Sequence, residues 1–181
     1  MGRKLLGFDA SKEWDYENGF YLTSHVTRVA KALAQFEPYK LVLCVPGHVV
    51  ECGVFKGASF IRLATFREVL ESPYSRRLVG FDAFGRFPRR GAVSPEEKRF
   101  VDDFELAAGR SIKVSELREV MKRKGIANYE LVRADVVRRA PAYLAANPAF
   151  RIALLHILTW IQVLRRLPSC RRATGGSCRA V

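Results

Sequence analysis

One stretch of this chain combines residue types and a spacing that could bind a nucleotide-type cofactor. Glu51 ends an apolar run, and Gly53 and Gly57 follow it four residues apart. Glycine permits backbone angles closed to other residues and lets a ligand approach the main chain closely. A helix that starts at this turn would also offer unpaired N–H groups at its N-terminus. The Glu-x-Gly-x-x-x-Gly pattern differs from the Gly-x-Gly-x-x-Gly of dinucleotide sites. A strand–turn–helix without a ligand is the alternative interpretation.

Two further acids, Asp82 and Asp135, also come directly after apolar runs. Ligands of open α/β sheets bind at the carboxyl ends of the strands, so the three acids are expected at one edge. A carboxylate there can accept hydrogen bonds from ribose hydroxyls or from an adenine amine. The alternative is that each acid only caps the helix that follows it.

Short apolar runs alternate with helical patterns, which predicts an α/β doubly wound sheet. The run at 150–157 is nearly all apolar, as expected of a parallel strand covered on both faces. Thr23 or Ser24 is expected to cap a first helix, which Pro38 interrupts before a second short helix over 39–45. Strands are predicted near 48–52, 77–81, 129–132 and 150–157, and the later helices over 58–71, 95–108, 113–124 and 136–146.

Length and composition indicate one globular domain with a substantial core. The chain has 181 residues, of which 49% are hydrophobic. It shows no signal peptide and no run near the roughly 20 apolar residues of a membrane helix. The four cysteines lack metal-type spacing, and Cys44 and Cys52 lie in apolar stretches, which predicts reduced core thiols. A cytoplasmic protein without a membrane partner is expected.

The formal net charge of +13 raises the question of nucleic-acid binding. Residues 158–181 hold five arginines and no acid, and residues 1–157 hold 26 basic and 18 acidic residues. The charges of residues 1–157 are scattered and form no basic stripe interleaved with aromatics. A solvated basic surface is therefore the favoured interpretation, with a nucleic-acid or anion partner as the alternative.

Four motifs together resemble the macrocin O-methyltransferase family of S-adenosylmethionine (SAM)-dependent enzymes, over about residues 14–157. They are NGFYLTS at 18–24, ECGVFKGAS at 51–59, FDAFGRFP at 81–88 and LLHI at 154–157. The resemblance implies a Rossmann-like methyltransferase fold and transfer of a methyl group from SAM to a hydroxyl of a sugar-like acceptor. It implies that Glu51, Gly53 and Gly57 shape the methionine end of the cofactor site, that Asp82 holds the ribose, and that Asp135 lies near the adenine. The cofactor-binding residues inferred on this basis are Glu51, Cys52, Gly53, Gly57, Ser59, Asp82, Ala83 and Asp135.

The sequence departs from the family after Ile157. The family places an Asp-x-Asp there, and later an Asp-Asp pair, and these carboxylates hold a divalent metal such as Mg²⁺ beside the acceptor hydroxyl. Here the chain continues Leu158-Thr159-Trp160-Ile161 and contains no further acid. A shift of reading frame allows Asp-Leu-Asp at this point, so we expect residues 158–181 to be a frameshift product on a truncated enzyme. A natural divergent helix over 158–167 is the alternative.

These features divide the chain into an arm (1–19) that we expect to be loosely ordered, a SAM-binding domain (20–157) and a basic tail (158–181). The parallel sheet is expected to be incomplete at its C-terminal side, which leaves 150–157 as an apolar edge able to pair with a second copy. Without the metal ligands, methyl transfer is expected to be impaired, and a remnant that only binds SAM is the alternative function. No catalytic residue is assigned, and His156 is interpreted as a structural residue at a strand end.

Overall fold

A four-stranded parallel sheet organises the computed structural model, which describes residues 4–85 and 95–158. Its strands are β3 (His48–Cys52), β4 (Leu78–Asp82), β5 (Tyr129–Arg133) and β6 (Ile152–Ile157), in the order β5-β4-β3-β6. β3 is central, with Val50 opposite Val79 of β4 and Leu155 of β6. The four predicted strands and their parallel arrangement are confirmed. The interpretations of the tail, from Thr159 onward, lie outside the described residues.

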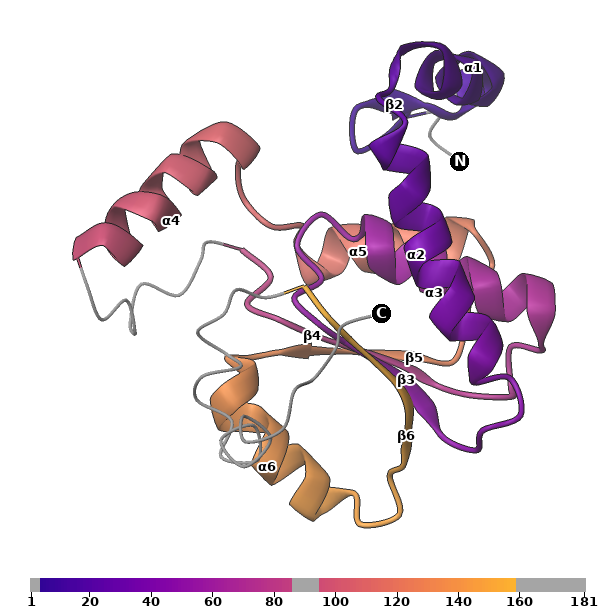
Figure 1. Ribbon diagram of the computed structural model, residues 1–181, viewed down its shortest axis with the longest axis vertical. Helices are drawn as coiled ribbons and strands as arrows, with labels where there is room; N and C mark the ends of the chain where they lie inside the picture. The colour runs from indigo at the N-terminus through magenta and orange to yellow at the C-terminus, as the bar shows by residue number, and fades with distance from the viewer. Residues whose placement is uncertain (1–3, 86–94, 159–181) are drawn as a thin grey trace, which may run out of the picture.

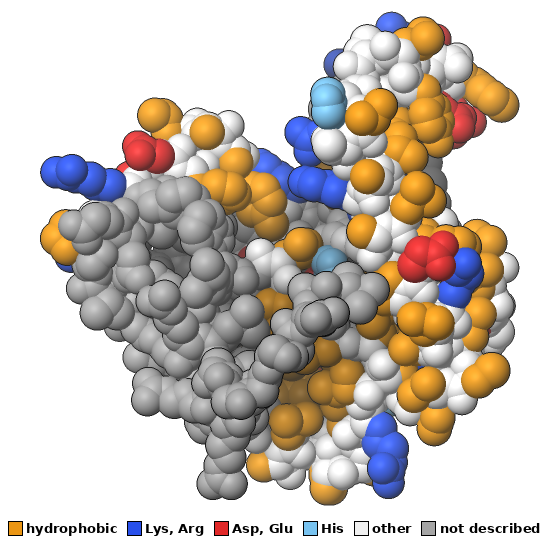
Figure 2. All heavy atoms as spheres, viewed as in Figure 1, with side chains coloured by type: hydrophobic (Ala, Val, Ile, Leu, Met, Phe, Trp, Pro, Cys, Tyr) orange, Lys and Arg blue, Asp and Glu red, His pale blue; other side chains and the backbone are white. Residues whose placement is uncertain are grey.

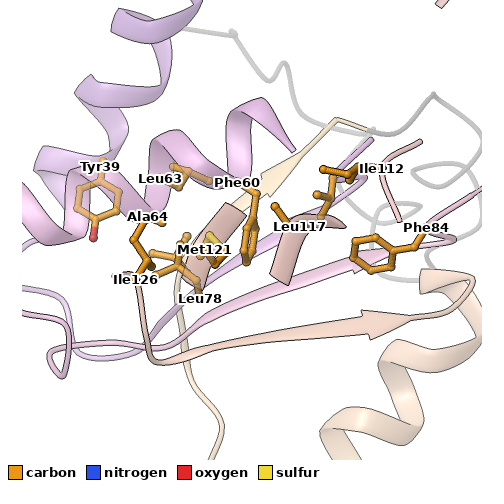
Figure 3. Packing of buried hydrophobic residues seen from close by; sticks show 12 residues of the cluster. Tyr39, Phe60, Leu63, Ala64, Leu78, Phe84, Ile112, Leu117, Met121 and Ile126 are labelled. Atoms are coloured by element: carbon orange, nitrogen blue, oxygen red, sulfur yellow. The ribbon is translucent and has the colours of Figure 1, made fainter. Parts of the chain in front are cut away.

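Helices cover both faces of this sheet (Figure 1). α2 (Thr27–Leu41), α3 (Ala58–Leu70) and α5 (Val114–Arg123) lie on one face, and α6 (Val136–Ala146) lies on the other. Side chains alternate between the faces along each strand, so Val49 and Val50 enter different cores. The larger core packs Phe60, Leu63 and Leu117 against the sheet, and Figure 3 shows this packing. The smaller core contains Cys52, Val79, Phe81 and Tyr143.

The N-terminal part differs from the predicted loose arm. β1 (Lys4–Leu5) and β2 (Phe8–Asp9) form a hairpin, followed by η1 (Ala10–Lys12) and α1 (Glu13–Thr23). α1 buries no residue, which explains why its sequence lacks the apolar periodicity that signals a helix. It projects away from the sheet in Figure 1, and Figure 2 shows hydrophobic side chains on the surface of this projecting part. Phe8 and Trp14 are among the exposed hydrophobic residues. The division of the chain into three parts stays a prediction.

The predicted break at Pro38 is also wrong, because α2 continues through it to Leu41. Proline lacks an N–H and usually ends or bends a helix. Here the following residue, Tyr39, is fully buried and its hydroxyl donates to Glu71 Oε2 at 2.6 Å, which holds the last turn against α3. The predicted caps do not form either. Thr23 ends α1, and its hydroxyl donates to the Gly19 carbonyl. Val26, the residue directly before α2, makes no capping hydrogen bond with its side chain.

The later helices are confirmed within one or two residues. α3 and α6 follow β3 and β5 as predicted, and a break at Gly109 separates α4 (Pro95–Ala108) from α5. Gly109 has φ +69, a left-handed conformation that glycine adopts without steric cost. Among the described residues, no helix has both the length and the apolar character needed to cross a membrane.

Candidate functional site

The turn between β3 and α3 requires glycine at two positions. Gly53 has φ +92 and Gly57, directly before α3, has φ +83, both in the left-handed region. A Cβ at Gly57 would also lie 3.2 Å from Leu117 Cδ1, which is closer than packed carbon atoms normally approach. The spacing of the two glycines in the sequence therefore reflects a real constraint on this turn. Between them, Phe55 is left-handed as well, with φ +49, although it is not glycine.

Asp82 holds this turn through backbone hydrogen bonds. Its Oδ2 accepts from the Phe55 N–H at 2.9 Å, and its Oδ1 accepts from the Phe84 N–H at 2.6 Å. Phe84 is also left-handed, with φ +51. A bulky residue in this conformation carries steric strain, and a charged acceptor stabilises both residues against it. The Asp82 carboxylate therefore ties the end of β4 to the glycine turn, and its role toward a cofactor stays a prediction.

Ser111 is a residue of this site that the sequence did not reveal. Its hydroxyl lies 3.0 Å from Asp82 Oδ1 and 2.8 Å from the Phe55 carbonyl oxygen, so its single proton serves one of them at a time. Its backbone N–H donates to the Gly85 carbonyl. The only sequence signal near it is the helix break at Gly109, which predicts a loop but no contact with Asp82. Ser111 joins the loop before α5 to both strand ends.

Glu51 is fully buried at the end of β3. Its Oε1 lies 3.0 Å from His156 Nδ1 of β6, and its Oε2 has no hydrogen-bond partner among the described residues. Burial raises the pKa of the Glu51 carboxyl, whereas the contacts with His156 and Ser59 act to lower it. A buried carboxylate oxygen without a donor is costly, so it marks a place where a bound group could donate. His156 thus has a defined contact in the site, beyond a structural place at a strand end.

The remaining predicted residues lie around these two acids. Cys52 points to the opposite core, and Ser59 is buried near Glu51. The Ala83 carbonyl accepts from Arg133 Nε at 3.2 Å. Asp135 is exposed at the start of α6, next to Ala134, whose N–H donates to the Asp82 carbonyl. The ends of β4 and β5 are therefore adjacent. The alternative that Asp135 only caps α6 stays open.

The acids of the site do not form a metal centre. Glu51 is bound to His156 and Asp82 to backbone N–H groups, and no three potential ligands of the His, Cys, Asp or Glu types gather at a metal site within residues 4–85 and 95–158. An Mg²⁺ ion needs about six oxygen ligands, part of them carboxylates that are free to coordinate. The residues described do not fit such an ion.

Cys44 and Cys52 are predicted to differ in reactivity. Cys44 is exposed, contrary to the sequence prediction of a core thiol, because residues 42–47 lie in the turn before β3. Cys52 is buried, and burial, followed by the nearby Glu51, raises the pKa of its thiol to about 11. Since the thiolate is the reactive form, a maleimide at about pH 8 should label Cys44 rapidly and leave Cys52 unlabelled. Peptide mapping by mass spectrometry resolves the two, and equal labelling in the folded protein would contradict the burial of Cys52.

Comparison with known proteins places the fold. No family model and no curated protein matches the chain. A solved structure that it resembles is the apo form of CalS11, a TDP-rhamnose 3'-O-methyltransferase of calicheamicin biosynthesis, with 29% identity and a TM-score of 0.53 over 86% of this chain and 62% of that chain. A second structure of CalS11, calicheamicin methyltransferase, gives 29% identity and a TM-score of 0.55 over 86% and 64%.

The chain thus spans less than two thirds of the length of the structures it resembles. The likeness confirms the Rossmann-like methyltransferase fold that the sequence predicts and supports a protein of the methyltransferase class. It does not distinguish the macrocin O-methyltransferases from other sugar methyltransferases, so that narrower assignment stays a prediction.

Proposed function

We propose that this chain binds SAM at the β3–α3 turn and belongs to a SAM-dependent O-methyltransferase that acts on a sugar-like hydroxyl. The observation that carries the proposal is the buried Glu51 carboxylate directly before the glycine turn, whose Oε2 has no donor in the part of the chain that the structure describes. A ligand with an ammonium group would supply this donor. SAM has one at its methionine end and carries no phosphate for the neighbouring carboxylates to repel.

Asp82 supports the ribose part of the proposal. Its Oδ1 is already near two donors, the Phe84 N–H and the Ser111 hydroxyl. Its Oδ2 accepts only the Phe55 N–H among the described residues, and a carboxylate oxygen can accept two hydrogen bonds. Oδ2 is therefore the atom that would accept from a ribose hydroxyl. Asp135, at the neighbouring strand end, remains the residue proposed to lie near the adenine.

When bound, SAM would supply an electrophilic methyl group to the acceptor. The described residues would bind and orient the cofactor, with Glu51 and Asp82 at its two polar parts, and positioning of this kind accounts for a large part of catalysis. A sugar hydroxyl is proposed as the acceptor because CalS11 is named as a methyltransferase of TDP-rhamnose and because of the macrocin-type motifs. We assign no described residue as a general base, so cofactor binding and methyl transfer are separate tests.

Two secondary proposals concern the setting of the protein. β6 has no strand beside its outer edge among the described residues, and Ile152 and Leu155 are 43% and 48% exposed, so we propose self-association through this edge.

We also propose a cytoplasmic location, because the exposed Cys44 suits a reducing compartment.

Replacing Gly53 by valine is predicted to weaken SAM binding by about tenfold or more, which corresponds to at least ~1.4 kcal/mol. Valine at φ +92 is strained, and its side chain would occupy the space where the ligand approaches the main chain. Gly19→Val is the matched control, because a Cβ at Gly19 meets no atom within 4 Å and lies in the projecting α1.

Calorimetric titration of SAM into the folded variants measures this effect, with circular dichroism as the check on folding. Equal affinity of wild type, Gly53→Val and Gly19→Val would refute the assignment of the cofactor to this turn. Incubation with methyl-labelled SAM and sugar-nucleotide acceptors then tests transfer, and label that stays in SAM in spite of binding would support the binding-only alternative.

A further inference from the structure

Four polar side chains from four different elements form a continuous hydrogen-bonded network on the α2 and α3 side of the sheet. Arg62 Nη1 of α3 contacts Gln35 Oε1 of α2. Gln35 Nε2 lies 3.0 Å from His156 Nε2 of β6. His156 Nδ1 lies 3.0 Å from Glu51 Oε1 of β3. This network ends at the buried Glu51 carboxylate, on which the candidate cofactor site depends.

The chemistry of these groups fixes where the imidazole proton lies. A guanidinium can only donate hydrogen bonds, so the atom of Gln35 that faces Arg62 must be the amide oxygen. The amide nitrogen of Gln35 then faces His156, and it too can only donate. His156 Nε2 must therefore accept, which leaves the proton on Nδ1, where it points to Glu51 Oε1.

We propose that Gln35 and Arg62 set His156 as the neutral Nδ1–H tautomer and thereby make it the positioning residue that holds Glu51 as a hydrogen-bonded anion, with the unpartnered Oε2 left to accept from the cofactor. This inference rests on the proposed function in that Oε2 is the atom proposed to accept from SAM. It gives a role to two residues, Gln35 and Arg62, that belong to none of the cofactor motifs in the sequence.

The electrostatics of Glu51 show why such a donor is needed. Burial is the largest influence on its carboxyl and raises the pKa, and the nearby Asp82 carboxylate raises it further. The His156 imidazole, whose Nδ1 lies 3.0 Å from Oε1, and the neighbouring Ser59 hydroxyl both lower the pKa. Without the imidazole, the carboxyl would be driven toward its protonated form, and its attraction for a cationic ligand would be lost.

Nuclear magnetic resonance of the histidine-labelled chain at neutral pH tests the tautomer without any cofactor. Two-bond proton–nitrogen correlations should show His156 protonated at Nδ1 and unprotonated at Nε2. Gln35→Glu is the decisive variant, since a carboxylate in that place accepts from Arg62 and from the imidazole, and it should move a proton onto His156 Nε2. A wild-type Nε2–H tautomer, or a tautomer that Gln35→Glu leaves unchanged, would overturn the proposal.

SAM affinity tests the consequence for Glu51. His156→Asn places an amide N–H where Nδ1 lies and should bind SAM within about threefold of wild type, whereas His156→Leu should bind about tenfold or more weakly. Equal loss in the two variants would indicate a purely structural role and would overturn the proposal. If the wild type itself binds no SAM, the proposed function fails, and the resonance experiment still decides the tautomer and the role of Gln35 separately.

Discussion

Replacing Asp82 by alanine is expected to lower the free energy of unfolding and the SAM affinity together. The carboxylate accepts from the N–H groups of Phe55 and Phe84, both left-handed, and is also near the Ser111 hydroxyl. A hydrogen bond to a charged group contributes roughly 1.5–3 kcal/mol. We therefore expect a loss of about 3 kcal/mol or more in unfolding free energy, measured by urea denaturation. The loss of the proposed ribose acceptor should cost about another 1.5–3 kcal/mol in binding.

A double-mutant cycle separates the contribution of the Asp82–Phe55 hydrogen bond to stability from the other effects of the Asp82→Ala substitution. Glycine at position 55 adopts a left-handed conformation without strain, so the Asp82→Ala substitution should destabilise less in a Phe55→Gly background, by about 1 kcal/mol. Ser111→Ala is the milder comparison, because it removes one donor and leaves both backbone contacts of Asp82 in place. Additive free energies in the cycle would show that Asp82 does not act by holding Phe55.

The sheet could be predicted because its strands carry their signal locally. The apolar runs ending at Cys52, Asp82, Arg133 and Ile157 are short and lie between helical patterns, which fixes the parallel class of sheet. The glycine turn could also be predicted, since left-handed backbone at Gly53 and Gly57 restricts the residue type. α1 could not be predicted because it buries no residue, so its sequence has no apolar face.

The site could be predicted only in part, because its contacts join residues distant in the sequence. The position of Asp82 follows from its place after a strand, but its bond to the Phe55 N–H spans 27 residues. Gln35 and His156 are 121 residues apart, and the sequence around Gln35 is that of an ordinary amphipathic helix. Only the fold that brings α2 over β6 shows that these two side chains meet.

The buried Arg67 gives the second large expected effect. Its side chain is completely buried, and it donates to the carbonyl oxygens of Arg76, Ala127 and Asn128 at 3.0, 2.6 and 2.8 Å. These carbonyls belong to the segments that lead into β4 and β5, so one guanidinium of α3 ties together the starts of two strands. It also contacts the partly exposed Glu68 carboxylate at 2.6 Å.

Arg67→Met is expected to lower the unfolding free energy by roughly 3–5 kcal/mol, because methionine fills similar space but removes three hydrogen bonds donated by a buried charged group. The Arg76 and Asn128 carbonyls keep a second donor, Asn128 Nδ2 and the Leu78 N–H, whereas the Ala127 carbonyl is left with no other donor among the described contacts. Arg77→Met is the matched control. Arg77 is about half exposed and pairs with Glu130 at 3.4 Å, and such a pair contributes about 0–1 kcal/mol. Urea denaturation followed by circular dichroism compares the two variants at the same pH. Equal destabilisation would mean that water or another group satisfies the carbonyls when the guanidinium is removed, and that Arg67 does not hold the strand starts together.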